Sequence, residues 1–286
     1  MWSNIRVRLK DALISAIDGL TAAHVGSPRM NAEVLLMFTL SCDRAYLYGH
    51  PERELTEDES SRYGQALAQR CHGVPSQYIT GHQEFWGMDL IVSPAVLIPR
   101  PETEHVIETI LPLARNVAKP KIVEVGTGSG CIALALAKEL PEAEIHATEI
   151  SPAALEIAGA NAARAQLQSR IHFHQADLLQ GLEPGSFDFV VSNPPYVGES
   201  EEDQVQLEVR KFEPRSAVFA GPTGLEIIEQ LVPAAGAALK PGGCLVMEIS
   251  GSIAAGVRQL LADWQEVRIS DDLQGIPRIA CARKPQ

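Results

Sequence analysis

The residues of this chain best suited to chemistry are Asn-Pro-Pro-Tyr at positions 193–196. An apolar run at residues 187–191 predicts a buried strand directly before them. Each proline fixes φ and lacks an N–H donor, so the turn is rigid and its carbonyl groups join no strand ladder. The side-chain oxygen of Asn193 and the carbonyl of Pro194 could together accept both hydrogens of a planar NH2 group, with Tyr196 covering its face. Taken alone, the motif also fits an ordinary stiff turn.

A glycine-rich loop lies earlier in the chain, between a predicted strand at residues 121–125 and a predicted helix at residues 131–140. Its glycines, Gly126, Gly128 and Gly130, allow the backbone to approach a bound ligand closely. The third glycine follows the second by two residues, whereas the dinucleotide fingerprint requires three, and no phosphate-binding Lys-Ser/Thr pair follows. The loop therefore favours a nucleotide-like ligand without a phosphate group.

Carboxylates stand at the ends of three successive predicted strands beside this loop. Glu124 lies at the end of the first strand, where its charge would repel a pyrophosphate but suit the ammonium and sulfonium of S-adenosylmethionine. Glu149, 19 residues after Gly130, is placed to accept hydrogen bonds from two ribose hydroxyls. Asp177 follows the third strand and can accept a hydrogen bond from the adenine amine. A helix cap or a solvated carboxylate is the alternative at each position, but the joint pattern predicts a class I methyltransferase site.

The first 72 residues predict a small helical bundle. Apolar residues recur at helical spacing from Ile5 to Leu20, and Ser27-Pro28 supplies a capping residue and a first-turn proline for a second helix. A third helix is expected from about Thr56 to Arg70, with acidic residues in its first turn, where the helix dipole favours them. This region contains no catalytic constellation, so packing or docking of a partner is its expected role.

Residues 73–98 change character, because β-forming residues alternate with glycine from Tyr78-Ile79-Thr80-Gly81 onward and predict a hairpin. The next segment, residues 99–104, is braced by two prolines ahead of a helix. This bracing fixes Arg100 and Glu102 relative to the domain that follows, which makes them candidates for positioning a substrate. A solvated ion pair between Arg100 and Glu102 is the alternative.

From residue 121 onward, predicted strands alternate with predicted helices. Strands are expected at residues 121–125, 145–148, 171–174, 187–191 and 244–248 and near residues 267 and 279, helices at 131–140, 151–161, 225–239 and 254–262, and a turn at 241–243. This alternation predicts a doubly wound, Rossmann-like α/β sheet of seven mostly parallel strands. The expected organisation is a helical domain at 1–74, a β-hairpin linker at 75–98 and an α/β domain at 99–286.

Composition and charge narrow the possible functions. A formal net charge of -12 argues against a basic nucleic-acid-binding surface. The five cysteines are scattered and form no Cys-x-x-Cys pair, so neither a disulfide framework nor a metal site is expected, and a reducing cytoplasm is the simplest compartment. No apolar run reaches the length needed to cross a bilayer.

Longer strings around these motifs resemble those of a known family. They are Gln77-Tyr78-Ile79-Thr80-Gly81, Glu84-Phe85-Trp86-Gly87, Ile98-Pro99-Arg100-Pro101-Glu102-Thr103-Glu104, Glu213-Pro214-Arg215 and Pro277-Arg278. Together with the glycine loop, Glu149, Asp177 and the motif at 193–196, they make the chain resemble the bacterial release factor glutamine methyltransferases, the HemK or PrmC family, from the helical bundle to the C-terminus. The Asn-Pro-Pro-Tyr string alone is shared with DNA adenine methyltransferases.

The resemblance implies a class I methyltransferase that uses S-adenosylmethionine to methylate the glutamine side-chain amide in the Gly-Gly-Gln motif of class I peptide chain release factors. It also implies a five-helix N-terminal domain that helps dock the release factor. The protein is expected to act as a monomer, without a metal, a membrane or direct nucleic-acid contact. The expected site residues are Asn193, Pro194, Pro195 and Tyr196 for catalysis and Glu124, Gly126, Thr127, Gly128, Ser129, Gly130, Glu149, Asp177, Leu178 and Asn193 for the cofactor.

Two positions depart from the family pattern, and two other functions stay open. Glu149 stands where Asp is usual, and Leu178 stands where an aromatic residue often packs on adenine.

An exocyclic-amine methyltransferase acting on adenine N6 in nucleic acid would use the same loop geometry, but residues 96–286 carry 16 basic against 25 acidic side chains, and no target-recognition domain is visible. The other alternative is a non-catalytic cofactor-binding module that docks a partner, against which the intact loop at Asn193 argues.

Overall fold

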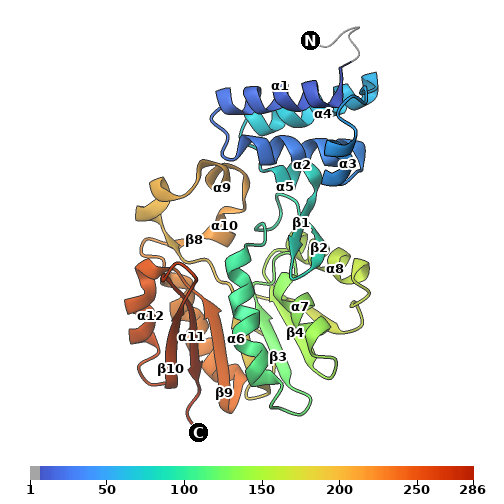
Figure 1. Ribbon diagram of the computed structural model, residues 1–286. Coiled ribbons are helices and arrows are strands. Elements are labelled where there is room, and N and C mark those ends of the chain that lie inside the picture. The colour runs from blue at the N-terminus through green and yellow to red at the C-terminus, as the bar shows by residue number, and fades with distance from the viewer. Residues whose placement is uncertain (1–6) are drawn as a thin grey trace. The chain divides into compact units, whose positions relative to one another are not determined.

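The computed structural model describes residues 7–286, and the chain divides into two compact units (Figure 1). The helical unit spans Met1–Gly81 together with Leu207–Phe212, and the α/β unit spans His82–Gln206 together with Glu213–Gln286. Ile5, the first residue of the predicted helical series, lies outside the described residues.

The helical unit combines five helices from the first part of the chain with one from much later. They are α1 (Leu9–Ala22), α2 (Pro28–Leu40), α3 (Arg44–Gly49), α4 (Glu57–Cys71), α5 (Ser76–Thr80) and α9 (Leu207–Phe212). Their apolar faces form a core that includes Leu20, Leu35 and Leu36, which are fully buried. A capping box begins α4, because Thr56 Oγ1 accepts from the backbone N–H of Glu59 at 3.2 Å, and the Glu59 carboxylate accepts from the backbone N–H of Thr56 at 2.9 Å.

Two local predictions for this unit were wrong. Pro28 begins α2 as expected, but Ser27 has a φ of 50° and its side chain makes no capping hydrogen bond. The residues Tyr78-Ile79-Thr80, expected to be extended, lie in α5. Pro75 and the left-handed Gly81 bracket a single helical turn there, and this overrides the β propensity of the residues between them.

A seven-stranded sheet with the order β10-β11-β9-β6-β3-β4-β5 forms the centre of the α/β unit. The strands are β3 (Lys121–Val125), β4 (Glu144–Glu149), β5 (Ile171–Gln175), β6 (Phe187–Ser192), β9 (Leu239–Glu248), β10 (Gln265–Asp271) and β11 (Pro277–Arg283). Neighbours from β9 to β5 run parallel, whereas β11 is antiparallel to both β9 and β10. The prediction of a mostly parallel seven-stranded sheet is confirmed. The turn expected at 241–243 lies instead within β9, where the register with β6 shifts.

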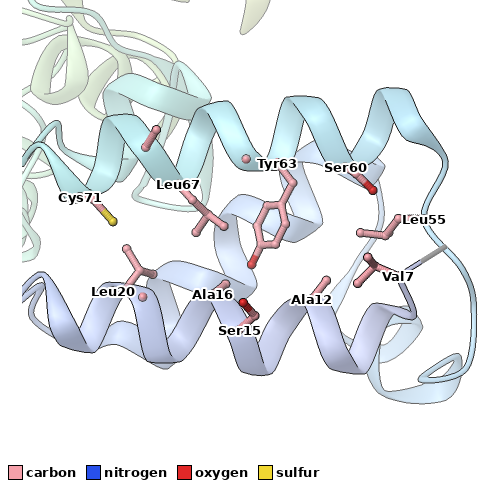
Figure 2. A pocket seen from close by; sticks show the side chains of 13 residues that line it. Val7, Ala12, Ser15, Ala16, Leu20, Leu55, Ser60, Tyr63, Leu67 and Cys71 are labelled. Atoms are coloured by element: carbon pink, nitrogen blue, oxygen red, sulfur yellow. The ribbon is translucent and has the colours of Figure 1, made fainter. Parts of the chain in front are cut away.

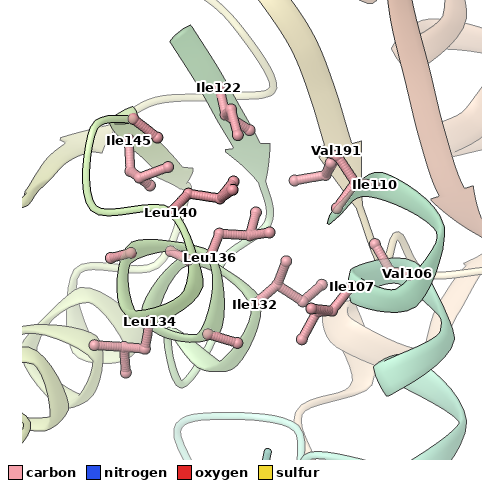
Figure 3. Close-up of a cluster of buried hydrophobic side chains, with 14 of the residues drawn as sticks. Val106, Ile107, Ile110, Ile122, Ile132, Leu134, Leu136, Leu140, Ile145 and Val191 are labelled. Atoms are coloured by element: carbon pink, nitrogen blue, oxygen red, sulfur yellow. The ribbon is translucent and has the colours of Figure 1, made fainter. Parts of the chain in front are cut away.

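Helices cover both faces of this sheet. The first layer contains α6 (Glu104–Ala114), α7 (Cys131–Glu139) and α8 (Pro152–Arg164), and the second contains α11 (Glu226–Ala238) and α12 (Ala254–Leu260). Successive residues of β3 divide between the layers, since Ile122 packs in the first and Val123 in the second. Figure 3 shows side chains of α6 and α7 meeting Ile122 and Val191 in the first layer.

Shorter elements complete the α/β unit. They are β1 (His82–Phe85), β2 (Met88–Ile91), η1 (Pro101–Thr103), β7 (Val197–Gly198), η2 (Glu199–Gln204), α10 (Arg215–Val218), β8 (Phe219–Gly221) and η3 (Gly251–Ile253). β1 and β2 pair antiparallel as a hairpin. Because β3, β4, β5, β6 and β9 are parallel, their carboxyl ends lie along one edge of the sheet, which is where open α/β sheets bind ligands.

Candidate active site

The glycine loop between β3 and α7 has three residues in the left-handed region. The φ angles are 72° at Gly126, 53° at Gly128 and 85° at Gly130. A Cβ atom at Gly130 would lie 3.3 Å from Ala158 Cβ and 3.3 Å from Leu134 Cδ1, so this glycine permits close helix packing. A Cβ atom at Gly126 or Gly128 would meet nothing within 4 Å. These two glycines therefore border open space in which a ligand can approach the backbone.

Glu124 holds the glycine loop in shape from inside the protein. Its side chain is buried, and its Oε2 accepts hydrogen bonds from Thr127 Oγ1 at 2.6 Å and from the backbone N–H of Ala133 at 2.9 Å. Burial raises the pKa of Glu124 to about 8, although both hydrogen bonds act in the opposite direction. Oε1 takes part in neither bond. A cation beside Oε1 would favour the ionised carboxylate.

Glu149 lies at the carboxyl end of β4, in contact with the glycine loop. Its Oε2 accepts from the backbone N–H of Gly128 at 3.0 Å, and its Oε1 accepts from the backbone N–H of Ser151 at 3.0 Å. Ser151 caps α8 as predicted, because its hydroxyl accepts from the backbone N–H of Ala154 at 3.2 Å. These bonds fix the carboxylate beside the open face of Gly128.

The third acidic position lies after β5. Asp177 is exposed two residues beyond the end of this strand. Leu178 has a φ of 49°, a conformation that costs a residue with a branched side chain about 1–2 kcal/mol. Such strain is typical of binding turns. Its side chain is half-buried against the second layer of the core, so part of it stays available to a ligand.

Asn161 of α8 belongs to the support of the glycine loop, and the sequence patterns missed it. Its side chain is 1% exposed. Nδ2 donates to the carbonyl of Ser129 at 2.9 Å and to the carbonyl of Ile91 at 2.9 Å, and Oδ1 accepts from the backbone N–H of Ile91 at 2.7 Å. One buried amide thus joins the loop, α8 and the hairpin. Its only local signal is a polar residue on the buried side of an Ala-rich helix.

The Asn-Pro-Pro-Tyr turn begins immediately after β6. Ser192, the last residue of β6, donates its hydroxyl to the carbonyl of Val125 at 2.8 Å and so joins the ends of β6 and β3. Asn193 Nδ2 donates to Thr103 Oγ1 at 3.0 Å. The hydroxyl of Tyr196 donates to Glu248 Oε1 at 2.8 Å. Burial, together with the nearby Glu248, raises the pKa of Tyr196, so the phenol remains protonated.

Two of these partners, Thr103 and Glu248, were missed by the sequence predictions. Glu248 ends β9 and is 1% exposed, and burial raises its pKa despite hydrogen bonds from Thr103 and Tyr196. Thr103 Oγ1 donates to Glu248 Oε2 at 2.7 Å. An acidic residue at the end of an apolar strand was the signal that identified Glu124 and Glu149, and it would also have found Glu248.

Arg100 pairs with a different residue from the one considered in the sequence. Its guanidinium forms an ion pair with Glu213 and donates to the carbonyl of Ile98 at 2.8 Å. Glu213 also accepts from the backbone N–H of Ile98 at 3.0 Å and is nearly fully buried. The alternative of a solvated Arg100–Glu102 pair was therefore wrong about the partner. The Arg-Pro-Glu and Glu-Pro-Arg strings are joined by this pair.

A cavity of about 270 Å³ lies within the helical unit, between α1 and α4 (Figure 2). It is lined by apolar and small residues, among them Leu20, Leu55 and Leu67. The ring of Tyr63 lies beside it, and its hydroxyl donates to the carbonyl of Ala32 at 3.0 Å. None of its lining residues belongs to the predicted site, which lies in the α/β unit.

No helix within residues 7–286 is long and apolar enough to cross a membrane. Over the same described range, no three His, Cys, Asp or Glu side chains are grouped as a metal site would require.

The sheet order, the glycine loop after β3 and the acidic ends of neighbouring strands define a class I methyltransferase. The hMettl16 catalytic domain in complex with the MAT2A 3′UTR hairpin 1 has a similar fold, with a TM-score of 0.56 at 16% identity, covering 82% of this chain and 83% of that one. The family model described as Methyltransferase small domain matches residues 104–211, and the one described as PrmC N-terminal domain matches residues 11–81.

Sequence relatives define the family within this class. A release factor glutamine methyltransferase from Koribacter versatilis is 56% identical over 278 residues, which cover 97% of this chain and 99% of that protein. Another from Moorella thermoacetica is 42% identical over 252 residues, covering 88% of this chain and 89% of that protein. The chain belongs to the release factor glutamine methyltransferase family.

Proposed function

We propose that this protein transfers a methyl group from S-adenosylmethionine to the side-chain amide nitrogen of the glutamine in the Gly-Gly-Gln motif of class I peptide chain release factors. The observation that carries the proposal is the orientation of Asn193. Its Nδ2 is held by Thr103, so its Oδ1 is directed away and is free to accept a hydrogen bond. Together with the carbonyl of Pro194, it offers two acceptors to the two hydrogens of a primary amide. The family of the chain supports a glutamine as the acceptor.

The chemistry of the strand ends supports S-adenosylmethionine as the methyl donor. Gly126 and Gly128 border open space, and no lysine of a phosphate-binding loop follows them. Glu149 is fixed beside this space, where a carboxylate can accept from ribose hydroxyls. Asp177 is exposed and can accept from the adenine amine, while Leu178 can pack on the ring. When bound, S-adenosylmethionine supplies an electrophilic methyl carbon on a sulfonium.

The main task of the protein is to align the amide nitrogen. An amide nitrogen is a weak nucleophile because its lone pair is delocalised into the carbonyl group, and its protons are too weakly acidic for a carboxylate to remove near neutral pH. Asn193 Oδ1 and the carbonyl of Pro194 accept the two N–H groups and favour the more pyramidal nitrogen of the transition state. Tyr196 covers the amide plane and excludes water. Methyl transfer would form the N–C bond as the C–S bond breaks, so that the sulfur leaves as a neutral thioether and its positive charge passes to the amide nitrogen. The nitrogen would then lose one proton and become a neutral N-methyl amide.

The change Asn193→Ala tests this assignment. It should lower turnover by roughly 10²-fold or more, as the removal of one oriented hydrogen-bonding group does in other enzymes. The dissociation constant of S-adenosylmethionine should change by only a few-fold, because Asn193 acts on the acceptor. Turnover is measured by mass spectrometry of the Gly-Gly-Gln peptide, and cofactor binding by calorimetry. A parallel loss of turnover and of cofactor binding would show that Asn193 has a structural role instead.

A further inference from the structure

A directional chain of hydrogen bonds ends on the side chain of Asn193. It begins at the buried carboxylate of Glu248, whose Oε2 accepts from Thr103 Oγ1 at 2.7 Å. Thr103 Oγ1 in turn accepts from Asn193 Nδ2 at 3.0 Å. The sheet register explains how the two ends meet. Ser192 pairs with Met247 across β6 and β9, so the next residues, Asn193 and Glu248, emerge side by side.

The direction of this chain follows from what each group can donate. An ionised carboxylate only accepts, so the single hydroxyl proton of Thr103 is used on Glu248. Thr103 then has only lone pairs to offer Asn193, and the side-chain amide must turn its NH2 group toward Thr103. Its oxygen is thereby turned away. If Thr103 instead donated to Asn193, the amide would reverse and present its NH2 group to the substrate, where two donors would face each other.

We propose that Glu248 and Thr103 are positioning residues that fix which end of the Asn193 amide faces the substrate glutamine. The inference rests on the proposed function and adds the residues that orient its acceptor. Neither residue touches the reacting atoms, and both act through Asn193. Glu248 also accepts from the hydroxyl of Tyr196 at 2.8 Å, so one carboxylate bonds Tyr196 directly and Asn193 through Thr103.

The orienting role requires the ionised form of Glu248. A protonated carboxyl group donates one hydrogen bond, so either Thr103 or Tyr196 would have to reverse its own. Burial raises the pKa of Glu248, and Glu102 acts in the same direction, whereas Thr103, Tyr196 and Arg278 lower it. Transfer at saturating substrate should therefore fall on the acid side as Glu248 takes up a proton.

The test compares variants of the full-length protein that keep shape but change donors and acceptors. Thr103→Val removes the hydroxyl and should lower kcat by roughly 10- to 100-fold, with the dissociation constant of S-adenosylmethionine within about 3-fold of the wild type. Thr103→Ser keeps the hydroxyl and should restore most of kcat. Thr39→Val is the matched control, because Thr39 is buried in α2 and its hydroxyl donates only to the backbone carbonyl of Leu35 at 2.7 Å.

Glu248→Gln provides a second, independent variant. The amide has one accepting and one donating end, so it cannot accept from both Thr103 and Tyr196. Glu248→Gln should lower kcat and remove the acid limb of the kcat–pH profile seen in the wild type. The melting temperature of the variant shows whether its fold is kept. Folded Thr103→Val and Glu248→Gln proteins with wild-type kcat and an unchanged pH profile would overturn the inference. If the wild type itself does not methylate the glutamine, the proposed function has failed instead.

Discussion

Glu124, Glu149 and Glu248 are three acidic residues at strand ends, yet their surroundings give them different tasks. Glu124 and Glu248 are buried, and burial raises both pKa values. Glu149 uses both oxygens on backbone N–H groups of the glycine loop and of α8. The sequence predicted Glu124 and Glu149 as acidic residues at strand ends. The different roles of the three carboxylates depend on hydrogen-bond partners that lie elsewhere in the chain, so only the structure shows them.

Glu124 should make the stability of the fold depend on pH. Its pKa is about 8 in the folded protein and 4.5 ordinarily, so the folded state keeps the proton over a range in which the unfolded state has lost it. Its stabilising contribution is complete below pH 4.5, decreases as the pH rises toward about 8, and is constant above that pH. Urea unfolding gives the free energy of unfolding of the wild type and of Glu124→Gln at each pH. The wild-type value minus the variant value should decrease as the pH rises. A difference in the free energy of unfolding that does not change with pH would mean that Glu124 is already ionised when buried.

Glu149 should contribute to cofactor affinity more than to the chemical step. Glu149→Ala is expected to weaken S-adenosylmethionine binding more than about 10-fold and to leave turnover at saturation within a few-fold. Glu149→Asp is the matched control, since it keeps the carboxylate and removes one methylene, and it should bind within a few-fold of wild type. Calorimetry gives both dissociation constants, and an unchanged value for Glu149→Ala would contradict the ribose assignment.

At the scale of elements, different glycines of the loop have different functions. Gly130 lies against Ala158 and Leu134, where α7 and α8 pack, whereas Gly126 borders open space. The loop and the strands around it were predictable, because glycine spacing and alternating apolar runs are local properties. The helical turn at Tyr78-Ile79-Thr80 was not, because Pro75 and Gly81 override the propensity of the residues between them.

Alanine at these two glycines should therefore have different effects. Gly130→Ala adds left-handed strain to tight contacts of 3.3 Å with Ala158 and Leu134, and it should destabilise the fold by roughly 2–4 kcal/mol. Gly126→Ala has the strain alone, so it should cost about 1–2 kcal/mol of stability and act mainly by weakening cofactor binding. Thermal melts and calorimetry on both variants test this division. Equal stability losses with equal binding would show that the space beside Gly126 is not a ligand site.

At the scale of the whole molecule, the parts that sequence reasoning missed are pairings between residues far apart in the chain. Thr103 meets Glu248, and Arg100 meets Glu213. Within the helical unit, α9 is held by an ion pair between the buried Arg70 and Glu208 at 2.8 Å. Periodicity and motif spacing report on local structure, so they predicted the fold class and the strand ends. They contain no information about which distant side chain satisfies a buried donor.

The central claim is that the acceptor is a primary amide of a protein, and a competition experiment tests it most directly. The enzyme is incubated with S-adenosylmethionine, a class I release factor and adenine-containing nucleic acid at equal concentrations, and every product is located by fragmentation mass spectrometry. The account predicts one methyl group on the glutamine side chain of the Gly-Gly-Gln motif and an unmodified nucleic acid. Methylated adenine with an unmodified glutamine would contradict it.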